Sequence, residues 1–195
     1  MKNWKRILAS GVAASALAAS LCATAPASAA TGAETEGTST VSLPMAFSGY
    51  DATAAEQNGY AIVTDATGAR SSVPVSADAI AFEQQLARQA SSRTAYVDGP
   101  CGSSWINAKS SGQRKTITTG YVVTHPVIAK TWTVQVWGWS GLPSFTWSGP
   151  SGATWFSSWA FNGGGDFANV LPGSNVVMSN GAVCVSGSPG ENFHS

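Results

Sequence analysis

Residues 129–161 read AKTWTVQVWGWSGLPSFTWSGPSGATWFSSWAF and contain six of the eight tryptophans in the chain. Apolar and polar residues alternate in the first part of this stretch. In an extended strand, this alternation puts Trp132 and its two valine neighbours on one face and puts Trp137 and Trp139 on the other. We therefore predict that the first face is core and that the second is a polar face ending in two indoles. A β-bulge at Gly138 would undo this assignment of faces.

The sequence around this stretch predicts an all-β fold. From about residue 94 onward, short β-favouring segments alternate with turn signals rich in Gly, Pro, Asn and Ser. The segments lie near residues 103–108, 115–124, 130–139, 143–148, 153–160, 167–171, 175–179 and 182–186. The regular turns favour an antiparallel β-sandwich or a barrel-like domain over residues 94–195. No fixed repeat period indicates a propeller or a solenoid.

The beginning of the chain has the pattern of a secretory signal peptide. Basic residues at positions 2, 5 and 6 precede the apolar run 7–21, and Ala27-Ser28-Ala29 supplies a cleavage pattern. The apolar run is shorter than the stretch of about 20 residues that spans a membrane. We therefore expect residues 1–29 to be removed and the protein to be secreted into the extracellular space, with no membrane span.

Two further segments precede the β-domain. Residues 30–59 are rich in Ala, Thr, Ser, Gly and Glu, and they are predicted to form a flexible, low-complexity segment because they offer little apolar surface to bury. Residues 60–93 predict a short hairpin followed by a helix, with Ser76 as the N-cap. This hairpin-helix region is interpreted as a linker, with a pro-segment as the alternative.

Charge and cysteine content narrow the functional classes. Without residues 1–29 the chain keeps seven basic and ten acidic residues, so no basic surface for nucleic acid is expected. The nearest approach to a basic cluster, Lys109, Arg114 and Lys115, is interpreted as a solvated turn. Cys22 lies in the signal peptide, and Cys101 and Cys184 remain as an even pair in an oxidising compartment. We predict that these two cysteines form a structural disulfide.

The segments around these cysteines carry a resemblance. Gly99-Pro100-Cys101-Gly102-Ser103-Ser104-Trp105-Ile106 opens the β-domain, and Asn180-Gly181-Ala182-Val183-Cys184-Val185-Ser186-Gly187 closes it. With the Ala-rich signal, the C-terminal half resembles small secreted actinobacterial proteins of unassigned function. The resemblance implies export and a bracketing disulfide, and it carries no activity or catalytic residue.

Residues for catalysis or metal binding are sparse. His125 and His194 are interpreted as surface histidines, and no nucleophile-elbow motif accompanies them. The carboxylates of the β-domain are Asp98, Asp166 and Glu191; a turn explains Asp166, and Glu191 lies in a Gly/Pro-rich tail that we expect to be mobile. Neither the ligand set of a zinc site nor the acidic spacing of a calcium loop is present. We predict no catalytic residue, no metal site and no cofactor.

The tryptophans therefore supply the functional hypothesis. Most of them are expected to be buried, because a small domain with few leucines and isoleucines needs their apolar surface. The predicted ligand-binding residues are Trp137, Trp139, Trp147 and Trp155. The predicted protein is a secreted, non-catalytic β-domain that binds polysaccharide, a cell-surface glycan or another surface partner through an aromatic patch. The alternative is a small secreted hydrolase, or an inhibitor of one, with unidentified active residues.

Overall fold

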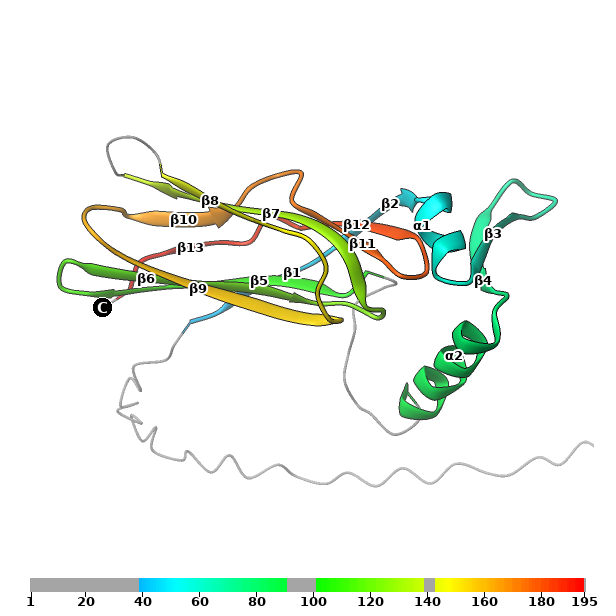
Figure 1. Ribbon diagram of the computed structural model, residues 1–195. Helices are drawn as coiled ribbons and strands as arrows, with labels where there is room; N and C mark the ends of the chain where they lie inside the picture. Colours follow the sequence, from blue (N-terminus) through cyan, green and yellow to red (C-terminus); the bar gives the residue numbers. More distant parts are fainter. Residues whose placement is uncertain (1–38, 91–100, 139–142, 195) are drawn as a thin grey trace, which may run out of the picture. The chain divides into compact units, whose positions relative to one another are not determined.

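The computed structural model describes residues 39–90, 101–138 and 143–194, and in these ranges most residues lie in antiparallel strands. Figure 1 shows two stacked sheets of the C-terminal region. The four-stranded sheet has the order β1-β5-β6-β9: β1 Val41–Pro44, β5 Ser103–Ser111, β6 Arg114–Val122 and β9 Thr154–Asn162. The sequence predicted an antiparallel β-sandwich or a barrel-like domain; the antiparallel β class is confirmed, and the strands form separate sheets.

The seven-stranded sheet is built around β7. It has the order β13-β10-β7-β11-β12-β2, and β8 pairs with β7 as well. Its strands are β2 Ala46–Tyr50, β7 Val127–Trp137, β8 Ser144–Ser148, β10 Phe167–Val170, β11 Asn175–Met178, β12 Ala182–Val185 and β13 Gly190–Asn192. All eight strands that the turn signals predicted in residues 103–186 are present.

The two sheets share one hydrophobic core. Trp132, Val134 and Val136 of β7 are fully buried, as their alternation predicted, and they belong to the same cluster as Ile106 of β5 and Tyr121 of β6. The indole nitrogen of Trp132 donates a hydrogen bond to Thr119 Oγ1 over 3.1 Å. Burying the polar end of this large side chain therefore leaves no unsatisfied donor.

Residues 39–59 correct one expectation. This part of the segment predicted to be flexible forms β1, β2 and the helix α1 (Ala52–Gln57). Strand β1 pairs with β5, and β2 pairs with β12, so the chain passes from one sheet to the other at the buried Met45. The segment is ordered because both sheets offer it an edge, and composition alone does not reveal such an edge.

The hairpin and the helix predicted after residue 60 are confirmed. Strand β3 (Tyr60–Thr64) pairs with β4 (Arg70–Pro74), and α2 spans Ala77–Ala90. Ser76 caps α2 as predicted, because its Oγ accepts a hydrogen bond from the Ala79 amide over 3.1 Å.

The predicted disulfide is present. Cys101 and Cys184 are bonded, with their Cα atoms 5.6 Å apart and a sequence separation of 83. Cys101 precedes β5 in the four-stranded sheet and Cys184 lies in β12 of the other sheet, so the bond ties the two layers together. Among the described residues, no helix is long and apolar enough to cross a membrane.

Candidate functional site

The predicted binding tryptophans do not share one surface. Trp147 is the register partner of Trp132, and its ring centroid lies 5.9 Å from that of Trp155. Trp155 in turn stacks on Tyr121 at 5.5 Å, and both tryptophans pack against the core. The prediction that Trp147 and Trp155 belong to an exposed patch is therefore wrong. Both indoles fill space between the two sheets.

A lysine also lies against the ring of Trp155. Lys130 Nζ lies 4.8 Å from the centroid of this ring and donates hydrogen bonds to the backbone oxygens of Gly149 (3.3 Å) and Pro150 (3.5 Å). Its side chain is almost entirely removed from solvent, and this desolvation lowers the pKa of Lys130. Contacts with the core and with this cation thus leave Trp155 only partly exposed.

Trp137 behaves as the alternation predicted. It ends β7 on the outer face of the seven-stranded sheet, with 41% of its surface exposed. Gly138 follows with φ +78°, and a Cβ added there would lie 2.4 Å from Asp166 Oδ2, so the chain leaves the strand at a position that requires glycine. Trp139 lies outside the described residues.

Polar groups and a second ring surround Trp137. Antiparallel pairing of β7 with β10 sets Phe167 opposite Trp137 and sets Asn169 opposite Gln135. The indole nitrogen of Trp137 donates to Asn169 Oδ1 over 2.7 Å, which fixes the orientation of the ring. We name Gln135, Trp137, Phe167 and Asn169 the Trp137 patch. It combines an exposed indole with two amide side chains and carries no formal charge.

The Phe167 ring of the patch packs on a glycine. A Cβ at Gly190 of β13 would lie 2.3 Å from Phe167 Cζ, so the Phe167 ring lies over the bare backbone of Gly190. Ser144, the register partner of Gln135 on β8, extends the polar surface on the other side. The alternating sequence pattern predicted Trp137 as a binding residue. It missed Phe167 and Asn169 because pairing brings them from about 30 residues farther along the chain.

Two of the residues considered for catalysis, His125 and Glu191, are occupied by structural contacts. His125 is buried, contrary to its interpretation as a surface residue: Nε2 lies 2.8 Å from Glu83 Oε1, and Nδ1 lies 2.9 Å from Thr124 Oγ1. The rings of Tyr60 and Phe82 lie against the imidazole, with centroids 6.2 and 5.7 Å away. This closed environment favours a role in holding α2 and the hairpin against the sandwich over a role in catalysis.

Glu191 is also buried, and the expectation of a mobile tail is wrong for it. It lies in β13, where Oε2 accepts a hydrogen bond from the Ala108 amide over 3.0 Å. Oε1 accepts a hydrogen bond from Ser39 and lies 3.2 Å from His194 Nε2. Asp98 lies outside the described residues, and Asp166 is exposed at the strand end beside Gly138. Within the described ranges, no three His, Cys, Asp or Glu side chains gather into a metal site.

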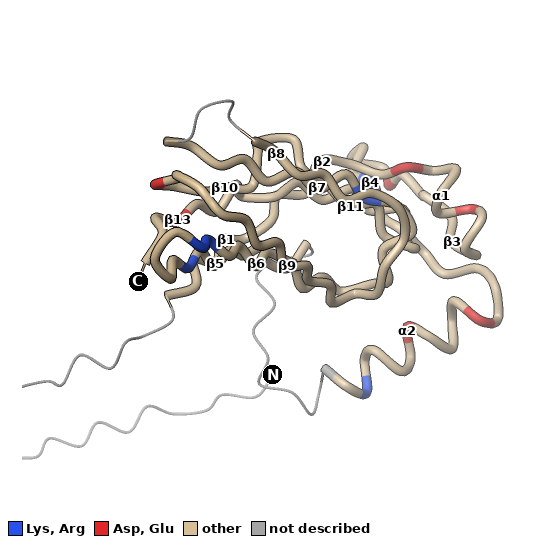
Figure 2. The backbone as a smooth tube through the Cα atoms, turned by 60° about the vertical axis from the view of Figure 1, so that its left-hand side comes forward, with Lys and Arg blue, Asp and Glu red and all other residues tan. Residues whose placement is uncertain are grey.

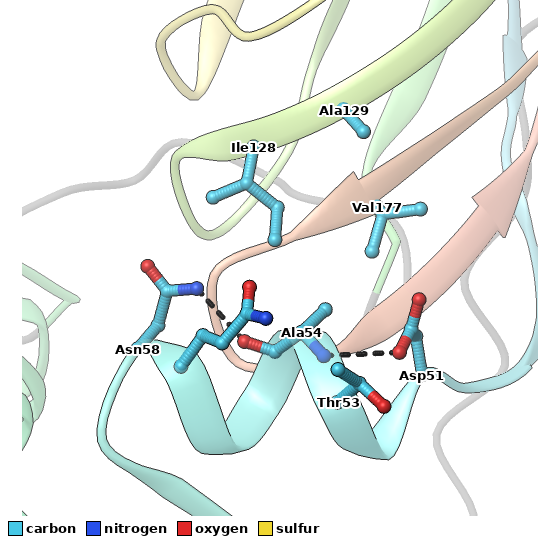
Figure 3. A pocket seen from close by; sticks show the side chains of 8 residues that line it. Asp51, Thr53, Ala54, Asn58, Ile128, Ala129 and Val177 are labelled. Atoms are coloured by element: carbon cyan, nitrogen blue, oxygen red, sulfur yellow. Dashed lines mark hydrogen bonds between the residues drawn. The ribbon is translucent and has the colours of Figure 1, made fainter.

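A pocket of about 510 Å³ lies between α1 and strands β7 and β11 (Figure 3). Its polar groups already serve the helix: Asp51 accepts from the Ala54 amide over 3.0 Å, and Asn58 donates to the Ala54 carbonyl over 2.8 Å. Ile128 and Val177 supply the facing apolar wall. The pocket contains none of the residues considered above for chemistry, so it does not gather them into an active site.

Comparisons with known proteins give no assignment. No protein-family model matches the chain, and no curated protein or solved structure matches it. Function must therefore be argued from the geometry of these sites.

Proposed function

We propose that this protein is a secreted, non-catalytic β-domain that binds neutral glycans through the Trp137 patch. The observation that carries the proposal is the exposed Trp137 indole, held by its hydrogen bond to Asn169 and flanked by Gln135. The face of an aromatic ring is electronegative, so it attracts the weakly positive C–H bonds on the flat side of a sugar ring. Fixing the indole in advance reduces the entropy that binding would otherwise cost.

The amide groups supply selectivity. The side chain of Asn or Gln offers both a donor and an acceptor, which suits the hydroxyl groups of a sugar. The residues of the patch are uncharged, so a neutral glycan meets no uncompensated charge there. Secretion is supported by the signal-peptide pattern of residues 1–29 and by the Cys101–Cys184 disulfide, which is typical of an oxidising compartment.

Replacement of Trp137 tests this proposal. We expect Trp137→Ala to weaken retention on insoluble polysaccharides by at least about tenfold, because removing a central aromatic anchor costs about 2 kcal/mol or more. Asn169→Ala should weaken retention less, because the indole remains but is no longer held. Retention is measured by depletion of the protein from solution over cellulose, chitin and insoluble xylan.

Phe47→Ala is the matched control. Phe47 is a ring of similar exposure, 44%, on β2 of the same sheet, and its loss should leave retention unchanged. Melting curves of all variants check that each one is folded. Equal retention of the wild type and Trp137→Ala, or retention of neither, contradicts the proposal. Specific capture of a purified protein by the wild type, with no glycan retained, would instead indicate a protein partner.

A further inference from the structure

The outer face of the four-stranded sheet carries a second aromatic surface. Register pairing sets Trp105 of β5 opposite Gly120 of β6, and Gly120 opposite Phe156 of β9. Phe156 is 66% exposed, the largest exposed fraction among the large hydrophobic residues of the described part of the chain. We name Trp105, Gly120 and Phe156 the Phe156 platform.

Gly120 makes this surface continuous. A Cβ at position 120 would lie 2.8 Å from Trp105 Cζ2 and 2.3 Å from the Trp155 carbonyl oxygen. The indole of Trp105 therefore lies over the backbone of β6 at Gly120. Phe156 is the register partner of Gly120 on the next strand. Because neighbouring strands are about 4.8 Å apart, the platform extends about 10 Å across three strands, perpendicular to the strand direction.

A row of hydroxyl groups runs parallel to the platform. Thr118 and Ser158 are the next outward-facing register pair, and their hydroxyl oxygens are hydrogen-bonded at 2.8 Å. One of the two hydroxyls donates this bond, so the other keeps a hydrogen to donate to a ligand, and both keep acceptor capacity. On the opposite side of the platform, Val122 pairs with Thr154. An aromatic row thus lies between a polar row and a mixed row.

Charge is confined to the far end of the same face. Lys109 is opposite Thr116, and Arg114 is opposite Ser111, one and two rows beyond the hydroxyl pair. Figure 2 shows the basic residues of this sheet gathered near the C-terminus, away from the middle of β9. The platform and the rows on either side of it are therefore neutral, which disfavours an anionic ligand there.

We infer that the Phe156 platform is a second glycan-binding site, specific for a neutral, extended β-1,4-linked polysaccharide. Phe156 is 66% exposed in the described part of the chain, so the face of its ring is available to a flat ligand. A β-1,4-linked chain of pyranoses with equatorial substituents keeps its rings flat along an extended ribbon. Such a chain can lie along Trp105 and Phe156, across the strands, with the hydroxyl groups of one edge over Thr118 and Ser158.

This second site gives the molecule two binding surfaces on opposite sides. Inner residues of both sheets share one core, whereas Trp137 and Phe156 lie on the outer faces of different sheets. An extended chain on one face cannot reach the other face. A single molecule can therefore hold two polysaccharide chains at once. The inference goes beyond the proposed function, because the two sites share no residue and can be tested separately.

The test compares Phe156→Ala, Trp137→Ala and the double variant of the full chain. Cellulose measures retention, and soluble β-1,4-glucomannan measures bridging through the rise in light scattering when protein is added. We expect each single variant to be retained about tenfold more weakly than the wild type and the double variant not to be retained. Bridging should be lost in both single variants, because one site cannot join two chains. Val63→Ala, at a residue 43% exposed on β3, controls for loss of surface apolar area.

The outcomes separate the two sites. If Phe156→Ala retains and bridges like the wild type while Trp137→Ala does not bind, the second site is wrong and the proposed function stands. If Phe156→Ala abolishes retention while Trp137→Ala is retained like the wild type, the second site stands and the Trp137 patch is wrong. If the wild type is not retained on cellulose and does not bind glucomannan, the inference is overturned. Because Phe156 is a surface residue, we expect its alanine variant to melt at the wild-type temperature. A melting curve that agrees with this expectation excludes misfolding as the cause of lost binding.

Discussion

At the scale of single residues, the buried carboxylate of Glu191 ties the two layers of the sandwich together. Glu191 accepts a hydrogen bond from the Ala108 amide of β5, although it lies in β13 of the opposite sheet. Its other oxygen, Oε1, accepts a hydrogen bond from Ser39 and lies within hydrogen-bond distance of His194 Nε2. A carboxylate has acceptors only, so it matches these donors better than an amide does. Glu191 thus acts as a polar connection between the two layers.

Replacement of this carboxylate should destabilise the fold. In Glu191→Gln, an NH₂ group must face a donor, and we expect the free energy of unfolding to fall by about 1–3 kcal/mol. Urea denaturation followed by tryptophan fluorescence measures the change. The exposed neighbour Asn192 provides the control, since Asn192→Ala should have little effect. If Glu191→Gln is as stable as the control, the carboxylate is not a structural acceptor.

At the scale of elements, Tyr60 of β3, Glu83 of α2 and His125 before β7 hold the hairpin and the helix to the sandwich. Burial, together with the neighbouring Glu83 carboxylate that accepts its hydrogen bond, raises the pKa of Tyr60 from 10.0 to about 12. The folded protein thus keeps the phenol proton at a pH where an unfolded chain has lost it.

This difference predicts an alkaline instability. Below about pH 10 both states hold the proton, so Tyr60 adds no pH dependence there; between about pH 10 and 12 the unfolded state loses it first, and stability falls. Tyr60→Phe removes this contribution, so its melting temperature should decline less steeply than that of the wild type over the same range. Tyr50→Phe controls for the loss of another tyrosine hydroxyl. Parallel declines in all three proteins would show that Tyr60 does not resist ionisation.

The elements also show what the sequence could and could not predict. Strand β7 was assigned correctly, including its faces, because its valines alternate with polar residues. In β8 and β9, aromatic residues alternate with Ser and Thr, and this pattern does not tell which set is buried. The sequence therefore predicts Trp147 and Trp155 as ligand-binding residues although both pack against the core, and it does not single out the exposed Phe156, which follows Trp155. Asn169 needed the β7–β10 pairing, which no local pattern encodes.

At the scale of the whole molecule, the Cys101–Cys184 bond closes a loop that contains most of both sheets. For the 83-residue separation, chain entropy assigns the bond about 4–5 kcal/mol of stability. We expect a Cys101→Ser, Cys184→Ser variant to lose that amount, measured by denaturant unfolding and compared with the wild type in the presence of reductant. If the serine variant and the reduced wild type have the same free energy of unfolding, the loss comes from the missing bond and not from the serine side chains. A loss under about 1 kcal/mol would contradict the estimate.

The passage of the chain between the sheets at Met45 sets the order in which the protein can fold. Strand β2 pairs with β12, so residues near position 50 must wait for residues near position 182 to be synthesised. A ribosome delivers these partners only at the end of translation, and pairing over such a distance is slow. Strand β2 therefore stays unpaired until the end of synthesis, whereas β1 can pair with β5 as soon as residues 103–106 have been made. The seven-stranded sheet should therefore be completed only after almost the entire chain has emerged, and a chaperone that holds extended segments would find its binding site in residues 46–50.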